Sequence, residues 1–469
     1  MAIDVVNVSA ADVKNTLTLE ENHFTEVKSI AVSPAKLTKA LSAFANADGG
    51  ELFVGIDEDK AKHRKIWNGF KRLEDANAHV QVFETIFPLG ENYTYEFLQA
   101  PKKSDGLVLH VTVQKSRDIK RATDGIPYLR RNAQSLPVST PEALALLERN
   151  KGLTTFETET VAVPIDLITN SETIIEFMLA VIPIGEPYPW LRKQILIRDD
   201  KPTVAALLLF ADEPQAALPK RSAIKIYRYR TTDEQGSRET LEFNPITIEG
   251  CLYKQIGDAV EKTRDLIQQV KILGESGLES IEYPLVTLHE IITNAVLHRD
   301  YAVLDDVHVR IFDNRVEVES PGRLPGHITE KNILSERFSR NGTLVRLINK
   351  FPDPPNKDVG EGLNTAFAAM KQLKLRDPII RQAENSVIVE IRHQRLGSPE
   401  QLIMDYLKDH DEITNKIARQ LTGIGSENTV KTIFYGLNKA GQIERVPDKK
   451  GNKAAWQKPR QSADILVDE

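Results

Sequence analysis

The chain has 469 residues, 41% hydrophobic and 27% charged, and its formal net charge of −6 gives no general affinity for nucleic acid; its length predicts about three globular domains. Its single cysteine, Cys251, excludes an internal disulfide and a zinc site of several thiolates, and the absence of any Gly-Lys dipeptide excludes a Walker A loop. The longest unbroken apolar run, residues 204–211, is too short to span a bilayer, and the first residues lack a signal-peptide pattern, so we expect a cytoplasmic protein.

Residues 1–150 predict an α/β domain, with a helix at 34–47 and strands at 51–56, 93–98 and 107–113. Four motifs occur in order: Glu-x4-Glu-Val-Lys, Ala-Phe-Ala-Asn-x2-Gly-Gly, Gly-Ile-Asp and Tyr-Leu-Arg-Arg. Together they resemble the Schlafen/Alba-like nucleic-acid-binding domain. The resemblance covers most of these residues and implies that this part of the chain binds nucleic acid.

Three acidic residues of this domain are candidates for a divalent-metal site: Glu21, Glu26 and Asp57. Such a metal can activate water or stabilise a phosphodiester transition state. In Schlafen-type RNases, two glutamates five residues apart and an aspartate after the Gly-Gly strand carry this role, so the resemblance implies metal-binding and catalytic roles here. The alternative is that these carboxylates pair with Lys28 and nearby arginines and hold the domain together, since many Alba-like relatives bind without cutting.

Basic side chains give independent support for nucleic-acid binding. The stretch 114–131 contains six Lys or Arg and only two acidic residues, and a second group of basic residues lies at 62–72. Basic side chains that line a groove gain affinity by releasing counterions from phosphates. The residues expected to contact nucleic acid here are Lys115, Lys120, Arg121, Arg130 and Arg131.

Residues 155–260 predict a connector domain to which we assign no chemistry. The stretch 204–210 fits either a buried strand or a helix, and 224–230 fits an edge strand. A helix predicted at 255–271 leads into the next domain.

The stretch 283–301 predicts an amphipathic helix, with Leu285 on its apolar side. Glu290, Asn294 and His298 follow one another at intervals of four, so their side chains form one polar row. Asn294 can offer a neutral oxygen to Mg²⁺, which prefers oxygen ligands. Glu290 can polarise the water that attacks a terminal phosphate. The alternative is a structural helix with an incidental polar face.

Two later stretches favour a nucleotide site. Residues 310–325 predict two strands joined by a turn at 314–315, then a loop in which Gly322 lets the backbone approach a ligand closely. Gly360 and Gly362 stand at the mouth of another predicted helix, whose exposed N–H groups and dipole suit a phosphate.

The polar row and the two glycine stretches, in this order, resemble the GHKL ATPase superfamily, and most of all the divergent domain of Schlafen/Alba-like prokaryotic proteins. The resemblance implies that the protein binds ATP with Mg²⁺. It implies that Asn294 is a ligand of this metal ion and that Glu290 is the catalytic base. The further expected ATP-binding residues are His298, Gly322, Gly360, Gly362 and, from a long polar loop predicted to be a lid, Arg340. Ser320 stands where classical members have the aspartate that contacts adenine, so phosphate binding is better supported than adenine specificity.

The last segment predicts a winged helix, with three helices followed by a hairpin: 399–409, 414–421, 426–440 and 442–456. The stretch 430–460 carries eight Lys or Arg against two acids. The third helix would contact base edges or backbone through Asn428, Thr429 and Thr432. The hairpin would contact phosphates through Lys449, Lys450 and Lys453. The alternative is a domain that serves dimer contacts.

The sequence thus predicts a multidomain protein of α/β and α+β class: a Schlafen/Alba-like domain at 1–150, a connector at 155–260, a GHKL (Bergerat) α/β sandwich at 261–395 and a winged helix at 398–460. The main hypothesis is an ATP-binding, slowly hydrolysing transcriptional regulator that binds DNA, or alternatively RNA, as a homodimer or higher homo-oligomer. The first alternative is an ATP-gated, metal-dependent nuclease of the kind that serves anti-phage defence. The second is an ATP-driven clamp with a structural role.

Overall fold

The structure is a computed structural model. It describes residues 5–59, 64–88, 92–218, 221–274, 277–355, 362–373, 375–393, 399–422, 424, 426–447, 449 and 454–459. The chain divides into two compact units, one formed by residues 1–367 and 378–390 and the other by residues 368–377 and 391–469. Along the described part of the chain, no helix is both long enough and apolar enough to cross a membrane.

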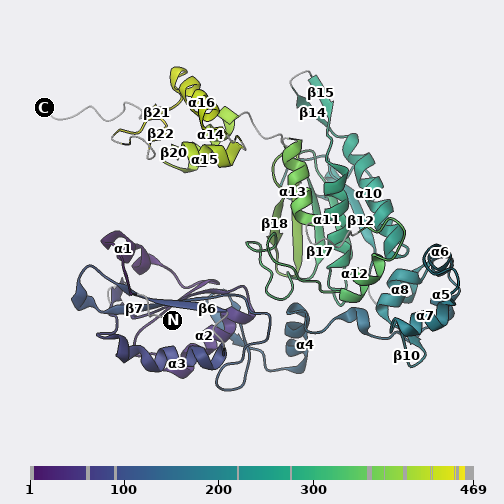
Figure 1. Cartoon of the computed structure of the whole chain (residues 1–469), viewed down its shortest axis with the longest axis horizontal. Helices are drawn as coiled ribbons and strands as arrows, with labels where there is room; N and C mark the ends of the chain where they lie inside the picture. The colour runs from purple at the N-terminus through teal and green to yellow at the C-terminus, as the bar shows by residue number, and fades with distance from the viewer. Residues whose placement is uncertain are drawn as a thin grey trace. The chain divides into compact units, whose positions relative to one another are not determined.

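The N-terminal part of the first unit is built on a five-stranded sheet in the order β1-β6-β7-β3-β2 (Figure 1). Its strands are β1 (Val5–Asn7), β2 (Thr25–Lys28), β3 (Gly50–Val54), β6 (Tyr93–Gln99) and β7 (Leu107–Val113). The three central strands are antiparallel neighbours, whereas each outer strand runs parallel to its partner. The strands predicted for this part of the chain are therefore confirmed.

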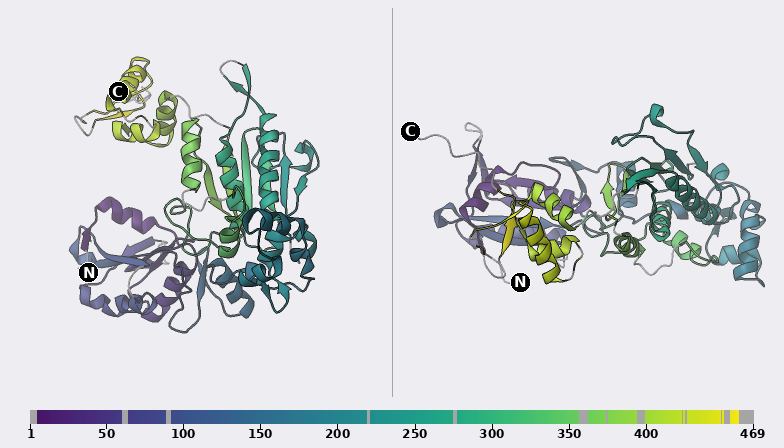
Figure 2. Two further views of the ribbon diagram at one scale, coloured as in Figure 1. Left: turned by 45° about the vertical axis from the view of Figure 1, so that its right-hand side comes forward. Right: turned by 90° about the horizontal axis from the view of Figure 1, so that it is seen from above.

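Helices cover both faces of this sheet because both faces carry apolar side chains (Figure 2). On one face, α2 (Pro34–Asn46) and α3 (Asn77–Ile86) bury Phe44 and Phe83. On the other face, α1 (Ala10–Thr18) packs through Val13 and Leu17. Two hairpins and a helix complete this part of the chain: β4 (Ile56–Asp59) with β5 (Arg64–Trp67), β8 (Tyr128–Arg131) with β9 (Gln134–Pro137), and α4 (Pro141–Asn150).

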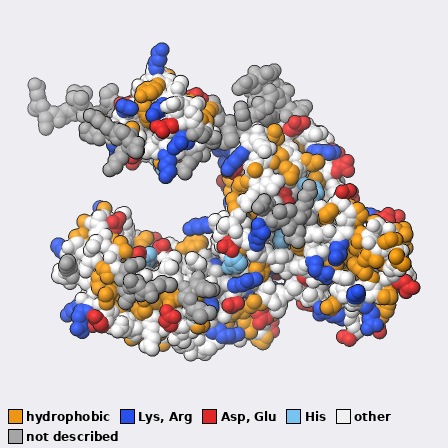
Figure 3. Space-filling view, viewed as in Figure 1, with side chains coloured by type: hydrophobic (Ala, Val, Ile, Leu, Met, Phe, Trp, Pro, Cys, Tyr) orange, Lys and Arg blue, Asp and Glu red, His pale blue; other side chains and the backbone are white. Residues whose placement is uncertain are grey.

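A helical segment follows. Its elements are α5 (Asp166–Thr169), α6 (Glu172–Val181), α7 (Pro187–Lys193), β10 (Ile197–Arg198), β11 (Lys201–Pro202), α8 (Val204–Phe210) and α9 (Pro214–Ala217). The apolar stretch 204–210, whose sequence fits either a strand or a helix, forms the helix α8. Every residue of α8 is buried. Hydrophobic side chains also gather on the surface of this segment (Figure 3), where the exposed ones are Leu167, Ile175, Leu179, Ile184 and Ile195.

The second sheet of the first unit has six strands in the order β13-β12-β16-β17-β19-β18. These are β12 (Ile224–Arg228), β13 (Ile246–Ile248), β16 (Val307–Ile311), β17 (Arg315–Pro321), β18 (Ile379–Gln382) and β19 (Ser386–Arg392). β12 pairs with β13 on one side and with β16 on the other, so the edge strand predicted at 224–230 is an interior strand. The second half of the predicted connector therefore contributes two strands to this sheet.

The hairpin between β16 and β17 turns one residue earlier than predicted. Ile311 pairs with Val316, and the Phe312 N–H donates to the Arg315 carbonyl at 2.8 Å. Asp313 and Asn314 therefore form the two-residue turn.

Helices α10 (Leu252–Gln268) and α11 (Leu285–Leu297) lie side by side over this sheet (Figure 1). The remaining elements of this part are β14 (Lys271–Gly274), β15 (Gly277–Ser280), α12 (Gly342–Ile348) and α13 (Gly362–Gln372). The predicted helices at 255–271 and 283–301 are thus present, and the assignment of a GHKL sandwich stays a prediction.

The C-terminal part of the second unit consists of three helices and a small sheet in the order β20-β22-β21. The elements are α14 (Pro399–Asp409), β20 (Ile413–Thr414), α15 (Asn415–Thr422), α16 (Glu427–Lys439), β21 (Glu444–Arg445) and β22 (Ala455–Gln457). They pack around a core that includes Ile403, Phe434 and Trp456. The predicted helices and the pairing of the hairpin strands are confirmed, and the winged-helix class stays a prediction.

Candidate functional site

Helix α11 positions the first two residues of the predicted nucleotide site one turn apart. Asn294 Nδ2 donates to Glu290 Oε1 at 2.8 Å, which leaves the Asn294 carbonyl oxygen for another partner. Leu285, predicted on the apolar side, is 49% exposed. Thr287 takes the inward position in that first turn instead, because its hydroxyl donates to the Ala366 carbonyl of α13 at 3.1 Å.

The first residue of α13 lies directly against Glu290. A Cβ at Gly362 would overlap the Glu290 carboxylate, so any other residue there would turn that carboxylate away or displace α13. Burial raises the pKa of Glu290, and the hydrogen bond from Asn294 opposes that shift. The structure therefore brings three of the predicted residues together, Glu290, Asn294 and Gly362, whereas Gly360 lies outside the described residues.

The end of α11 is anchored in the protein interior. His298 is its C-cap, and burial lowers the pKa of the imidazole to about 4, with the positive charge of Arg340 acting in the same direction. His298 is therefore neutral at pH 7. The next residue, Arg299, is 1% exposed and donates to the carbonyls of Arg221 and Asp305.

Gly322 makes a close approach to the protein itself, and its expected approach to a ligand stays a prediction. Its φ is +102°, and an added Cβ would lie 2.6 Å from Asp300 Cβ. Asp300 in turn donates its N–H to the Pro321 carbonyl at 2.8 Å. Ser320, at the position of the classical aspartate, donates to the Ala295 carbonyl of α11 at 2.7 Å.

Arg340 is corrected, because it is buried rather than presented to a phosphate. Its guanidinium lies 3.3 Å from the Asp300 carboxylate and donates to the carbonyls of Arg149 and Arg323. The side chain of Arg340 is only 2% exposed. Arg340 therefore anchors the predicted lid to the rest of the first unit at this position.

The acidic residues of the N-terminal domain meet a lysine. Lys28 Nζ lies 2.8 Å from both the Glu21 and the Glu26 carboxylates, and Glu26 also pairs with Arg130. Asp57 accepts from Asn68 Nδ2 at 2.5 Å. Among the described residues, no group of three His, Cys, Asp or Glu is arranged to hold a metal ion. The pairing expected under the structural alternative is present, and a metal at this position stays a prediction.

Two of the five basic residues predicted to contact nucleic acid are buried, which corrects their assignment. Lys115 Nζ donates to the carbonyls of Leu324 and Ile328, at 2.9 and 3.0 Å. The Arg130 side chain is fully buried and donates to the carbonyls of Asn22 and Thr25.

The other three basic residues reach the surface. Arg121 is exposed, Arg131 forms an exposed ion pair with Glu384, and Lys120 is half-buried with its ammonium 5.6 Å from the Phe87 ring centroid. These three remain candidates for phosphate contacts.

The first turn of α16 presents Asn428 and Thr429 to solvent. The Thr429 N–H donates to the Ser426 hydroxyl at 3.3 Å, so Ser426 caps the helix as predicted. Lys449 is exposed and pairs with Glu412 at 2.5 Å. Lys450 and Lys453 lie outside the described residues.

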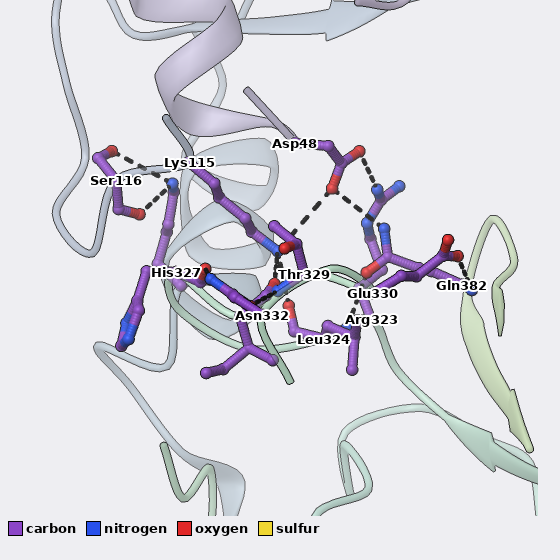
Figure 4. A network of polar contacts seen from close by, with 12 residues as sticks. Asp48, Lys115, Ser116, Arg323, Leu324, His327, Thr329, Glu330, Asn332 and Gln382 are labelled. Atoms are coloured by element: carbon purple, nitrogen blue, oxygen red, sulfur yellow. Dashed lines mark hydrogen bonds and ion pairs between the residues drawn. The ribbon is translucent and has the colours of Figure 1, made fainter. Parts of the chain in front are cut away.

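One polar cluster was missed by sequence reasoning. Asp48, at the turn between α2 and β3, accepts from Arg323 at 2.8 Å and from Gln382 at 3.1 Å (Figure 4). These partners are 275 and 334 residues away along the chain, so no local pattern links them to Asp48.

Comparisons with known proteins agree with two of the predicted domains. Residues 21–139 match the family model "Schlafen, AlbA_2", and residues 305–391 match the one described as "Putative ATP-dependent DNA helicase recG C-terminal". No curated protein matches the chain. The crystal structure of the DIP2311 protein from Corynebacterium diphtheriae aligns over 96% of this chain and 96% of its own, at 17% identity and a TM-score of 0.41.

The fold and these matches define the class: a multidomain α/β protein that joins a Schlafen/AlbA-type domain, a type associated with nucleic acid, to an ATPase-like one. More particularly, the chain contains a Schlafen AlbA_2 domain at residues 21–139, followed by a divergent ATPase-like domain that includes residues 305–391.

Proposed function

We propose that this protein binds ATP with magnesium on α11, hydrolyses it slowly and binds nucleic acid, most simply as a DNA-binding transcriptional regulator. The observation that carries the proposal is the meeting of Glu290, Asn294 and Gly362. A carboxylate, an amide oxygen and the N-terminus of a helix are the groups that a nucleotide phosphate and its metal use. The match to an ATPase-like family model, over residues 305–391, includes Gly362 and begins shortly after α11, and it supports the same class.

The residues fit the expected magnesium ion. The Asn294 amide nitrogen is engaged by Glu290, so its carbonyl oxygen is the atom left to act as a metal ligand. Magnesium would neutralise charge on the phosphates. Glu290, whose pKa is raised by burial, is suited to hold and orient the attacking water and to take its proton.

The test separates the two roles on α11. Asn294→Ala should abolish ATP binding, because the metal ligand is lost. Glu290→Ala should keep binding but lose turnover by about 10²–10⁴-fold, because only the general base is gone. Equal, unimpaired turnover in both variants would contradict the assignment.

A second candidate function is metal-dependent cleavage of nucleic acid. The observation that bears on it is that the Glu21 and Glu26 carboxylates both reach one cation, the Lys28 ammonium, at 2.8 Å each, although a structural role for these carboxylates predicts the same pairing. Glu21→Ala, Glu26→Ala and Asp57→Ala should then each abolish cleavage, and their effects should not add, because one metal site fails as a unit. Unchanged cleavage by the triple variant, or no cleavage of labelled DNA or RNA by the native protein, would exclude it.

A further inference from the structure

A largely buried carboxylate joins the AlbA-type domain to the ATPase-like domain within the first unit. Asp48 belongs to the former, and its side chain is 14% exposed. One of its oxygens lies 2.9 Å from His23 Nε2. The same oxygen lies 2.8 Å from the Arg323 guanidinium, and the other oxygen accepts from Gln382 at 3.1 Å (Figure 4). Burial opposes ionisation, but the hydrogen bond from His23 and the charges of Arg323 and Lys115 hold the pKa of Asp48 well below its usual range. Asp48 is therefore a carboxylate at neutral pH.

Lys115 extends the same contact from the AlbA-type domain. Its ammonium lies 3.8 Å from Asp48 and donates to the backbone carbonyls of Leu324 and Ile328. Burial lowers the pKa of Lys115 to about 8. Both segments of the ATPase-like domain at this junction, the one after β17 and the end of β18, are thus held by buried polar groups.

On one side, the junction continues to the end of the candidate nucleotide helix. Arg340 donates to the Arg323 carbonyl and pairs with Asp300, which lies three residues beyond the end of α11. Gly322, the residue before Arg323, packs against the same Asp300. A shift of α11 on nucleotide binding would therefore displace Arg323 through these contacts.

On the other side, the junction continues to the basic segment of the AlbA-type domain. Asn46, two residues before Asp48, donates through Nδ2 to the carbonyls of Lys120 and Tyr128 at 2.7 and 2.9 Å. Its Oδ1 accepts from the Lys120 N–H at 2.8 Å. The turn that carries Asp48 therefore also fixes the backbone beside Lys120 and Arg121, which are candidates for phosphate contacts.

We propose that the contact of Asp48 with Arg323 and Gln382 couples the nucleotide site to the nucleic-acid-binding surface, so that ATP changes the affinity for nucleic acid through this junction. This inference rests on the proposed function and adds its regulation. Asp48 is a positioning residue, since it acts through the segments that it holds. The exposed ion pair of Arg131 with Glu384 joins the same domains but is open to water, so it contributes little.

The test measures coupling in the full-length protein. Fluorescence anisotropy gives the affinity for a fluorescein-labelled duplex DNA and, separately, for a labelled single-stranded RNA, each with and without magnesium and a non-hydrolysable ATP analogue. We expect the analogue to change the affinity for one of these probes at least about fivefold in the native protein. We expect the ratio to fall to about one in Asp48→Asn and toward one in Gln382→Ala, which leaves the contacts of Asp48 with His23, Lys115 and Arg323 intact. Glu384→Gln, the matched control, should keep the native ratio.

A purely structural role for Asp48 would weaken binding with and without the analogue alike and leave the ratio unchanged. Linkage adds a check, because the nucleic acid must change the affinity for the analogue by the same factor. If the native protein binds both ligands with a ratio of one, or if Asp48→Asn and Gln382→Ala keep the native ratio, the coupling is refuted and the proposed function stands. If the native protein binds no ATP analogue, the proposed function fails and the coupling with it.

Discussion

Lys115 and Arg130 show how far a residue type predicts a role. Both belong to a basic stretch that the sequence assigns to nucleic acid, yet both are buried and donate to backbone carbonyls. Composition gives the charge of a segment but not which side chains point inward, since that depends on partners far away in the sequence. Arg340 was misassigned for the same reason, because its partner Asp300 lies outside its own loop. Spacing by four on one helix, in contrast, brought Glu290 and Asn294 together as predicted.

Gly362 allows a residue-scale prediction. Gly362→Ala should place a methyl group into the Glu290 carboxylate and turn that side chain away, so ATP turnover should fall at least about tenfold while stability falls by less than about 1 kcal/mol. Turnover assays and thermal unfolding measure the two effects. Gly257→Ala in α10 is the control: a Cβ there meets no atom within 4 Å, so stability should rise by about 0.5–1 kcal/mol without loss of turnover. Native turnover in Gly362→Ala would show that the close approach is not required.

At the scale of elements, helices and strands with a regular apolar pattern were predicted well. The three C-terminal helices and the three strands predicted for the first sheet, β3, β6 and β7, are close to their predicted bounds, because local periodicity and capping residues such as Ser426 specify them. Neighbours within a sheet were not predictable in the same way. β12 has the short alternating pattern of an edge strand, but its parallel pairing with β16 depends on a segment about 80 residues further along the chain.

The junction at Asp48 predicts a dependence of stability on pH. The folded-state pKa of Asp48 is depressed, so its contribution is present above the unfolded-state value of about 3.9 and is lost as the pH falls below that value. Asp48→Asn should therefore lower the free energy of unfolding by about 1–3 kcal/mol at pH 7. The difference from the native protein should shrink progressively below about pH 4.

Thermal unfolding of both proteins from pH 3 to pH 8 measures this difference. Glu384→Gln, which removes only an exposed ion pair, should stay close to the native protein over the whole range. A difference between Asp48→Asn and the native protein that is constant down to pH 3 would contradict the assigned pKa direction.

At the scale of the molecule, the sequence predicted the order of the AlbA-type and ATPase-like domains, which the family matches confirm. It placed the boundary of the ATPase-like domain too late, since β12 and β13 belong to the same sheet as β16. Sequence motifs identify residues with candidate binding or catalytic roles. The strands that complete a sheet need only apolar side chains, so no sequence motif identifies them.

The C-terminal unit allows a prediction at this scale. Deleting the chain from residue 398 onward should leave ATP binding intact, because Glu290, Asn294 and Gly362 all precede that point.

If the unit binds duplex DNA, neutralising Lys449, Lys450 and Lys453 should weaken binding to specific and random duplexes alike. The slope of log affinity against log salt should flatten by about 0.9 per lost phosphate contact. Unchanged affinity and salt slope in the truncated protein would make the unit an assembly element.

The central claim is that α11 and the mouth of α13 form a nucleotide site. Isothermal titration calorimetry of the intact native protein with ATP, in the presence and absence of magnesium, tests it most directly. We expect saturable binding of one ATP per chain that depends on magnesium and is lost in Asn294→Ala. No heat of binding with the native protein, or the same binding with Asn294→Ala, would contradict it.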